Sequence, residues 1–398
     1  MYAYPWTAVH EGVRPMLSAI SVRAGCDAVS VAFTYHHAKL LAPHGPRPTM
    51  HFADANGVYF RPTLSRYRDT GIQPNVSSLA IERDVLAEVR AQARQIGIAL
   101  RAWIVCLHNS GQATRHPDAA QMTVYGDPLL FSLCPSHPDV REYVTQLIVD
   151  VAVTYEPDAI ELESLEYLPF THGHHHELTG VALDPYHEFL LGLDFNPHTR
   201  ADMERRGVDV ERVAEFVRGE LDRFFAGGSE CTGVGFDYLP HVLFAHPEVA
   251  AFLQARVAIV TELFDEVARA VRSVANTAVH AILSMWRPVH LAWAEGYSPS
   301  QLVEIVDRLG LPAYYPLGRI APEVVHLRRE IGDLSAVTAL VDAGAPLVTS
   351  EAELAATTDL LRSLGINDLA FYNYSLVRSE VLDWIRHATR GRDRGSPA

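Results

Sequence analysis

The same joint occurs at four places in this sequence: an apolar helical segment, a glycine, and then a short apolar strand. A glycine just past the end of a helix supplies the left-handed residue that closes the last turn. Alternation of helices and strands along the chain predicts a parallel sheet with helices packed against it. The four joints are Ala24-Gly25 before Ala28–Tyr35, Ile96-Gly97 before Ile98–Leu107, Leu309-Gly310 before Leu311–Tyr315, and Leu364-Gly365 before Asp368–Tyr374.

Eight segments qualify as strands, which is the number that a closed (β/α)8 barrel needs. The first of them is the weakest prediction, because it contains Pro5. An open, doubly wound sheet is the alternative, but no Gly-x-Gly-x-x-Gly or Walker-type loop follows any strand. We therefore predict an α/β fold, a (β/α)8 TIM barrel. The expected strands are Tyr2–Trp6, Ala28–Tyr35, Ile98–Leu107, Asp158–Ser164, Val279–Met285, Leu311–Tyr315, Ala336–Asp342 and Asp368–Tyr374.

Two segments interrupt the regular repeat. Residues 38–80, after the second strand, are rich in Pro, Gly and Asn, and Val58-Tyr59-Phe60 could form an extra hairpin strand. Residues 165–248, after the fourth strand, contain one clear helix at about Val210–Phe225 and much loop, before the long helix Val249–Val274. We predict a single barrel domain over 1–390, with a disordered tail at 391–398. Insertions after barrel strands gather at the C-terminal face, where ligands bind.

Charge and composition exclude some classes of partner. A formal net charge of −15 argues against nucleic acid or an anionic membrane surface. No apolar run approaches the length of a membrane span, and the N-terminal residues lack a signal-peptide pattern, so we expect a cytoplasmic protein. The cysteines are far apart and form no Cys-x-x-Cys, which predicts reduced thiols at Cys26, Cys106, Cys134 and Cys231.

The fourth expected strand, Asp158–Ser164, carries two carboxylates on one face. Side chains alternate across a strand, so Glu161 and Glu163 point the same way. Burying an unpaired carboxylate is costly, and these residues therefore need partners, a water-filled cavity or a chemical role. A satisfied ion-pair network is one interpretation, and Arg101 on the third strand could pair with Glu161 in a structural role. Glu163 lies nearer the barrel mouth and is the first candidate for a catalytic residue.

Glycoside cleavage needs two carboxyl groups, one protonated as general acid and one acting as nucleophile or base. The sequence leaves the second group open. Glu166 is close in sequence to Glu163 and ranks first, Glu177 lies in a histidine-rich segment, and Asp342 ends the seventh strand. We predict Glu163 and Glu166 as the catalytic pair.

Polar and aromatic residues collect at the expected strand ends. Trp and Tyr rings around carboxylates suit a sugar, because aromatic faces stack on its C–H surfaces while polar groups bind its hydroxyls. An isolated aromatic residue is more often part of the core, so the prediction depends on several of them converging. The predicted substrate-binding residues are His36, Trp103, His108, Asn109, His175, His176, Glu177, Trp286, Tyr315, Asp342, Tyr372 and Asn373.

The segment His172-Gly173-His174-His175-His176-Glu177 allows three interpretations. It could be a polar loop over the barrel mouth, a substrate contact, or part of a transition-metal site completed by His36, His37 or His108. Neither His-Glu-x-x-His nor His-x-x-x-His on a helix is present, and we predict no metal and no cofactor. A nucleophilic serine is not supported either, since no Gly-x-Ser-x-Gly occurs.

Residues 158–167, Asp-Ala-Ile-Glu-Leu-Glu-Ser-Leu-Glu-Tyr, resemble a segment of glycoside hydrolase-like barrels in which Asp-Gly-apolar-x-apolar-Asp-aromatic ends a strand, often before Arg-Tyr-Pro. By position, the acidic residue of that pattern falls on Glu163. This chain departs from the pattern at Ala159, which replaces the glycine, at Glu163 itself, which replaces an aspartate, and at Glu166, which replaces the arginine.

A longer resemblance covers most of the chain. The chain is similar to an uncharacterised bacterial family of TIM-barrel, glycoside hydrolase-like proteins. In that family the stretch matching Leu191–Pro197 is cysteine-rich, whereas here it reads Leu-Gly-Leu-Asp-Phe-Asn-Pro, so no thiol-based metal site is expected there. The blocks that carry the resemblance are residues 28–36, 57–62, 102–110, 133–141 and 175–177.

These observations lead to one functional hypothesis and two alternatives. The hypothesis is an enzyme that hydrolyses or rearranges a glycoside or related polyol, with a small-molecule carbohydrate as its partner. The first alternative is a metal-dependent hydrolase or lyase that uses the histidine-rich segment. The second is a non-catalytic carbohydrate-binding barrel.

Overall fold

The computed structural model describes residues 1–55, 57–172, 181–227 and 233–390 and has at its centre a barrel of eight parallel strands. The strands are hydrogen-bonded in chain order, and at the seam the amide of Tyr374, just past the last strand, donates to the carbonyl of Tyr2 at 2.9 Å. The predicted barrel is therefore confirmed, and each of the eight predicted strands overlaps an observed strand. In order they are β1 (Tyr2–Ala3), β2 (Ala28–Tyr35), β6 (Ala99–Val105), β9 (Ala159–Glu163), β10 (Ala278–Ile282), β11 (Arg308–Pro312), β12 (Val337–Asp342) and β13 (Asp368–Tyr372).

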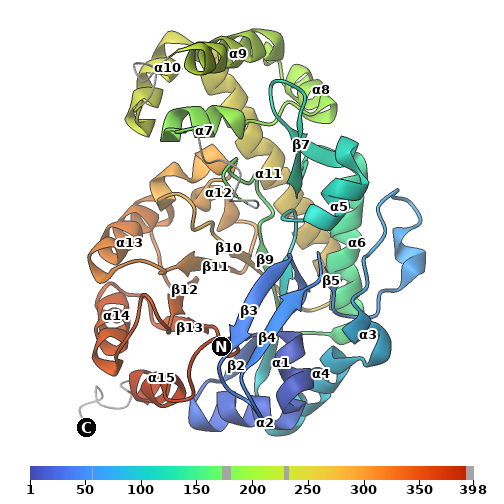
Figure 1. The fold of residues 1–398 in the computed structure, drawn as a ribbon, viewed down its shortest axis with the longest axis vertical. Coiled ribbons are helices and arrows are strands. Elements are labelled where there is room, and N and C mark those ends of the chain that lie inside the picture. Colours follow the sequence, from blue (N-terminus) through green and yellow to red (C-terminus); the bar gives the residue numbers. More distant parts are fainter. Residues whose placement is uncertain (56, 173–180, 228–232, 391–398) are drawn as a thin grey trace.

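Helices follow every strand and surround the barrel (Figure 1). Their inner faces and the outer faces of the strands form one large apolar core. The helical segments of the ring are α1 (Pro5–Glu11), α2 (Val13–Ser18), the π-helical η1 (Ala19–Arg23), α4 (Val85–Ile96), α6 (Pro138–Tyr155), α11 (Pro247–Val274), the 3-10 helix η6 (Val289–Glu295), α12 (Pro299–Leu302), α13 (Leu317–Ile331), α14 (Glu351–Ser363) and α15 (Val381–Arg390).

Three of the four predicted helix–glycine joints have the expected left-handed backbone. Gly97 has φ 73° and its amide bonds to the carbonyl of Ala93, and Gly25 and Gly365 also have positive φ. The fourth joint is wrong: Gly310 lies inside β11, because the preceding helix α12 already ends at Leu302. A Cβ at Gly310 would lie 3.4 Å from the Ile282 side chain of the neighbouring strand.

The first strand is shorter than predicted. It ends at Ala3, because Pro5 begins helix α1 instead of lying within the strand. Proline suits the first turn of a helix, where its missing amide would have no intrahelical partner.

The insertion after β2 folds over one side of the barrel mouth. Its antiparallel hairpin places the ring of His51 on Trp6, with a centroid distance of 4.3 Å. The predicted extra strand at Val58 is present as β5, which pairs antiparallel with β2. The elements of this insertion are β3 (Ala38–Ala42), β4 (Thr49–Ala53), β5 (Gly57–Val58), the 3-10 helix η2 (Leu64–Tyr67) and α3 (Ser78–Glu82).

A further insertion after β6 was not predicted. It is joined to the barrel just past the C-terminal end of β6, where the amide of Leu133 donates to the carbonyl of Leu107 at 2.9 Å. It consists of α5 (Ser110–Arg115), the 3-10 helix η3 (Pro117–Ala119), β7 (Ala120–Met122) and β8 (Pro128–Leu133), the last two forming a separate antiparallel pair.

The insertion after β9 is more helical than predicted. The expected helix near Val210–Phe225 is present, but three further helices replace much of the expected loop, and together they bury a second apolar core against α11. These helices gather at one end of the molecule (Figure 1). They are α7 (Pro185–Leu191), α8 (Pro197–Arg205), α9 (Val210–Ala226), the 3-10 helix η5 (Phe236–Tyr238) and α10 (Leu239–Ala245).

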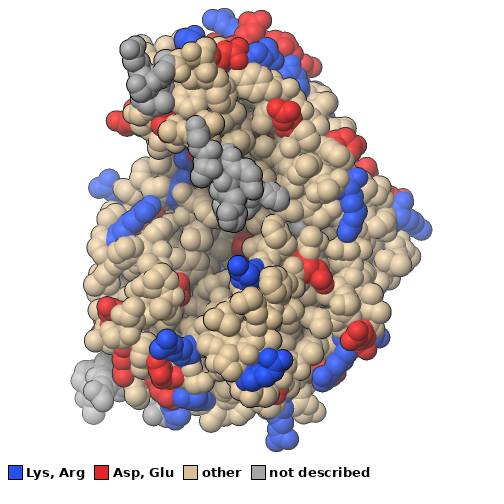
Figure 2. Space-filling model, viewed as in Figure 1, with Lys and Arg blue, Asp and Glu red and all other residues tan. Residues whose placement is uncertain are grey.

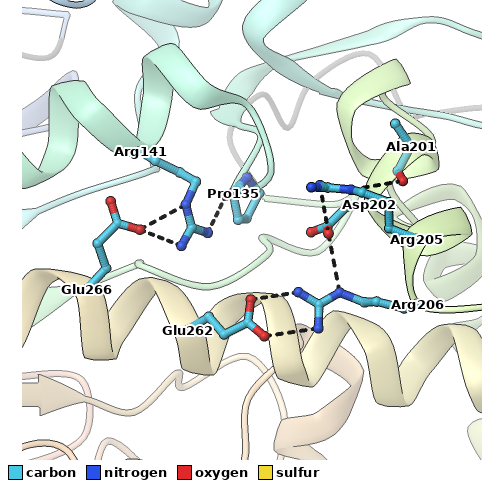
Figure 3. A network of polar contacts seen from close by, with 8 residues as sticks. All are labelled: Pro135, Arg141, Ala201, Asp202, Arg205, Arg206, Glu262 and Glu266. Atoms are coloured by element: carbon cyan, nitrogen blue, oxygen red, sulfur yellow. Dashed lines mark hydrogen bonds and ion pairs between the residues drawn. The ribbon is translucent and has the colours of Figure 1, made fainter.

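Ion pairs tie this insertion and α6 to α11 (Figure 3). Arg206, just past α8, bonds to Glu262 of α11 at 2.6 Å, and Arg141 of α6 bonds to Glu266 of α11 at 2.6 Å. Among the described residues no single helix is long and apolar enough to cross a membrane. Helices α10 and α11 meet that criterion only as a pair, across a bend of 112°.

Candidate active site

All eight barrel strands or the loops that follow them contribute to one cavity of about 420 Å³ at the C-terminal mouth. Figure 2 shows a hollow near the middle of this side of the molecule, surrounded mostly by uncharged residues. The described residues that line the cavity include carboxyl groups, imidazoles and aromatic rings but neither Lys nor Arg. Its volume lies in the range of small-molecule binding sites.

Glu163 enters this cavity from the end of β9. The indole Nε1 of Trp103, on the neighbouring strand β6, donates to its Oε2 at 2.6 Å. Burial raises the pKa of Glu163 to about 7, and the charge of Glu161 adds to the rise, while the Trp103 hydrogen bond opposes it. A substantial fraction of Glu163 is therefore protonated near neutral pH.

Glu161 lies one layer deeper in the barrel and has ionic partners. Its Oε1 lies 3.4 Å from Arg101 Nη1 and 3.9 Å from His280 Nδ1. Burial disfavours its charge, but His280 and Arg101 outweigh that effect and lower the pKa of Glu161 to about 2. The two acids of the strand thus differ in role, and the structural pairing expected between Glu161 and Arg101 is present.

The chain turns sharply after Glu163. Ser164 has φ 56°, a left-handed conformation that is unusual for a residue with a side chain. Both Ser164 and Glu166 line the cavity. Glu166 is 4% exposed, and burial raises its pKa well above the usual range, with further contributions from the charges of Glu295 and Glu163. Burial therefore favours the neutral form of Glu166 over the charged form.

Asp342, at the end of β12, reaches the same cavity from another side of the barrel. Two strands, β10 and β11, separate β12 from β9 in the barrel order. The amide of Gly344 donates to Asp342 Oδ1 at 3.0 Å, which stabilises the charged form, although burial raises the pKa of this carboxyl above its ordinary value. Asp342 is partly exposed to the cavity.

Aromatic side chains form much of the remaining wall. The rings of Tyr2 and Tyr35 pack edge-on against Trp103 at centroid distances of 5.2 and 5.1 Å. Behind them the hydroxyl of Tyr4 bonds to those of Tyr35 and Tyr372, at 2.9 and 2.7 Å. This packing and bonding hold the indole that contacts Glu163 in one orientation.

Three imidazoles line another part of the mouth. His36 stacks on His108 at 4.3 Å, and His172 Nε2 lies 3.0 Å from His108 Nδ1 and packs against Trp286. Burial lowers the pKa of His36 to about 4 and that of His108 well below its usual range. In the part of the chain that the structure describes, no three His, Cys, Asp or Glu side chains are arranged to hold a metal ion.

The structure brings eight of the predicted site residues to the cavity wall. These residues are Glu163, Glu166, His36, Trp103, His108, Trp286, Asp342 and Tyr372. His175, His176 and Glu177 lie outside the described residues, as do Cys231 and the tail at 391–398.

Three other predicted site residues do not line this cavity. Asn109 caps helix α5 by accepting a hydrogen bond from the amide of Gln112 at 2.9 Å. Strand β11 ends three residues earlier than expected, and Tyr314, not Tyr315, lines the cavity. The Tyr315 hydroxyl instead donates to the carbonyl of Met285. Asn373 lies in the wall of a neighbouring groove.

Tyr2, Tyr35, Tyr314 and Ser284 also line the cavity, although they are not among the predicted site residues. Tyr35 and Tyr314 stand at predicted strand ends, so a stricter use of strand alternation could have selected them. No sequence pattern identified Tyr2, because an inward tyrosine near the start of a short strand is indistinguishable from a core residue. No sequence pattern identified Ser284 either.

Comparison with solved structures identifies the fold. No protein-family model matches the sequence, and no curated protein is detectably similar to it. The glycoside hydrolase domain of PgaB (BpsB) from Bordetella bronchiseptica superposes with a TM-score of 0.60 at 14% identity, covering 100% of this chain and 98% of that one. A β-galactosidase from Marinomonas ef1 gives 0.58 at 10% identity, covering 98% and 59%.

A Group IV chitinase from Ostrinia furnacalis gives a TM-score of 0.50 at 8% identity, covering 98% of this chain and 99% of that one. These identities establish a similarity of fold alone. The chain thus has the TIM-barrel architecture of glycoside hydrolase-like proteins, as the sequence resemblance indicated.

Proposed function

We propose that this protein hydrolyses a glycoside or a related sugar, with Glu163 as the general acid. The observation that carries the proposal is the state of Glu163: a carboxyl with a pKa of about 7, oriented by Trp103, in an aromatic-lined cavity at the barrel mouth. A general acid works best when its pKa lies near the operating pH. The glycosidases among the structural neighbours agree with this reaction class.

In this mechanism Trp103 holds Oε2 of Glu163, which leaves Oε1 to carry the proton. That proton passes to the glycosidic oxygen as its bond to the anomeric carbon breaks, so the leaving group departs as an alcohol. The anomeric carbon forms its new bond to water or to the second carboxylate, whose glycosyl ester water then hydrolyses. The surrounding tyrosine and tryptophan rings offer faces for the C–H surfaces of the sugar. The absence of Lys and Arg from the described lining favours a neutral sugar over an acidic one.

The second carboxyl has two candidates in the described residues, and we favour Asp342. Burial disfavours the charged form of Glu166, and the charged form is the one that acts as nucleophile or base. Asp342 opens to the cavity and receives a hydrogen bond that stabilises its charge. An ionised Asp342 and a protonated Glu163 would supply the two complementary states that glycoside cleavage requires.

The first experiment is turnover of a glycoside panel by the wild type and by Glu163→Gln. We expect the substitution to lower kcat by about 10²–10⁴-fold while the protein stays folded. Glu215→Gln, on the exposed side of α9, is the matched control and should retain full activity. Unchanged turnover by Glu163→Gln would exclude this residue as the acid.

The same panel separates the remaining hypotheses. Asp342→Asn should lose about 10²–10⁴-fold in kcat. Glu166→Gln should lose less than about tenfold, because it places a neutral side chain where burial already disfavours a charge. A larger loss of kcat in Glu166→Gln than in Asp342→Asn would assign the role of nucleophile or base to Glu166. Sugar binding without turnover of any member by the wild type would support the non-catalytic alternative, and stoichiometric bound zinc, manganese or iron would support the metal-dependent one.

A further inference from the structure

A second groove adjoins the cavity and is not used by the mechanism above. It also has a volume of about 420 Å³, and Asp342 and Tyr372 line both spaces, so the two adjoin at these side chains. Its walls come from the β3–β4 hairpin, the loop after β12, the loop after β13 and helix α15 (Figure 1).

The groove has an apolar surface suited to a sugar ring. Trp384 of α15 is half-buried, and Leu41 of the hairpin is 57% exposed, although large apolar side chains are usually covered. Val348 and Val381 lie beside them in the same wall. An aromatic face next to aliphatic side chains offers a platform for the C–H surface of a pyranose.

An unsatisfied hydrogen-bond donor lies in the same wall. Asn373 is 1% exposed, and its Oδ1 accepts from the amide of Ser375 at 2.9 Å. No described residue accepts a hydrogen bond from its Nδ2 amide. A buried donor without an acceptor is costly, and a water or ligand oxygen that reaches it would remove that cost.

We propose that this groove is a second sugar-binding subsite, and that the substrate is a neutral oligosaccharide passing from the cavity over Asp342 and Tyr372 onto Trp384. This inference rests on the proposed function, because it assigns the groove to the same substrate. The hairpin of the insertion after β2 thereby acquires a role, since it supplies Leu41 to the groove. The enzyme would favour chains over single-sugar glycosides.

The kinetic test uses two substrate types: a chromogenic aryl monoglycoside and glucose-, galactose- or N-acetylglucosamine-based oligosaccharides of two to six residues. For the wild type, kcat/KM should rise at least about tenfold with chain length, which corresponds to ~1.4 kcal/mol. Trp384→Ala should remove that gain and leave the aryl monoglycoside unchanged, while Trp384→Phe should restore most of it. Equal loss on both substrate types, or no dependence on length, would overturn the proposal.

Two controls keep the test decisive. Leu41→Ser changes an exposed side chain and should also reduce the gain with length, so it decides the outcome if Trp384→Ala does not fold. Trp293→Ala removes a half-buried tryptophan that lines neither space, and its length dependence should match the wild type.

Calorimetric binding separates failure of this inference from failure of the proposed function. Glu163→Gln is titrated with the oligosaccharides, alone and combined with Leu41→Ser. Weaker binding of the longer chains by the double variant would support the groove even if the wild type hydrolyses nothing. Equal binding of the longer chains by the single and the double variant would exclude the groove as a sugar-binding subsite, even if hydrolysis is confirmed.

Discussion

The indole N–H of Trp103 donates to the Glu163 carboxyl at 2.6 Å, from one strand of the barrel to the next. The hydrogen bond fixes the orientation of the acid and favours its charged form, whereas burial favours its neutral form. These opposing effects hold the pKa of Glu163 at about 7. A change at Trp103 should therefore alter both the position and the pKa of the acid.

Trp103→Phe removes the donor and keeps most of the ring. We expect the pKa of Glu163 to rise above about 7, so that the protonated acid persists to higher pH and the alkaline limb of the kcat/KM profile moves upward. The maximal rate should fall by about 10–100-fold, because the acid is less well oriented. The pH–rate profile measures both effects, and Trp293→Phe is the control. An unshifted alkaline limb would show that the hydrogen bond does not set this pKa.

Arg101→Ala should destabilise the fold. It leaves Glu161 buried with His280 as a remaining neighbour. Breaking a buried ion pair costs about 3–5 kcal/mol, and we expect the lower end because Arg101 is partly exposed. Urea unfolding at pH 7 measures the loss, and the double variant Arg101→Ala/Glu161→Gln should recover part of it. No recovery would mean that Arg101 stabilises through packing instead.

The contribution of Glu161 to the free energy of unfolding should decrease as the pH falls. The folded pKa of Glu161, about 2, is below its unfolded value, so its stabilising contribution is present above pH 4.5 and disappears as the pH falls toward 2. The difference in unfolding free energy between the wild type and Glu161→Gln should therefore shrink over that range. A difference that stays constant down to pH 2 would contradict the assignment.

Glu295 should make the protein less stable as the pH rises. It is 2% exposed, and burial raises its folded pKa to about 7, so the folded state holds a proton that the unfolded state loses near pH 4.5. The contribution is fully present below pH 4.5 and is lost as the pH rises through 7. Glu295→Gln should therefore stabilise the protein by roughly 1–3 kcal/mol at pH 8 and much less at pH 5. Urea unfolding at both pH values measures this, and an equal effect at both would refute it.

Gly296→Ala should disturb the turn next to the site. Gly296 has φ 84°, and a Cβ there would lie 2.6 Å from the ring of Tyr167, the residue that follows Glu166. Gly97→Ala is a matched control, because Gly97 has φ 73° with nothing within 4 Å of the added Cβ. The control should lose only about 1–2 kcal/mol from backbone strain, and Gly296→Ala about 1–3 kcal/mol more from overpacking. Thermal unfolding of both variants gives the comparison, and equal losses would show that the ring moves freely.

Local patterns in the sequence were sufficient for the barrel and for its acidic strand. Apolar runs separated by helices and glycine turns identified all eight strands, because these signals depend only on neighbouring residues. Strand alternation likewise placed Glu161 and Glu163 on one face of the strand. It led us to expect an ion pair for Glu161 and a catalytic role for Glu163. The placement of Gly310 at a helix end failed, since a glycine within a strand produces the same local signal as one that ends a helix.

The contacts between distant residues needed the tertiary structure. Strand β11 ends three residues earlier than predicted, and Tyr314, not Tyr315, lines the cavity. Local hydrogen bonding made Asn109 a helix cap. The pKa of Glu163 depends on burial and on a tryptophan 60 residues away, and Asp342 joins the cavity only because the sheet closes. The sequence by itself thus determined which residue types stand at the ends of the strands. Only the closed barrel decided which of them meet, because burial and electrostatic coupling depend on distances between segments that are remote in the chain.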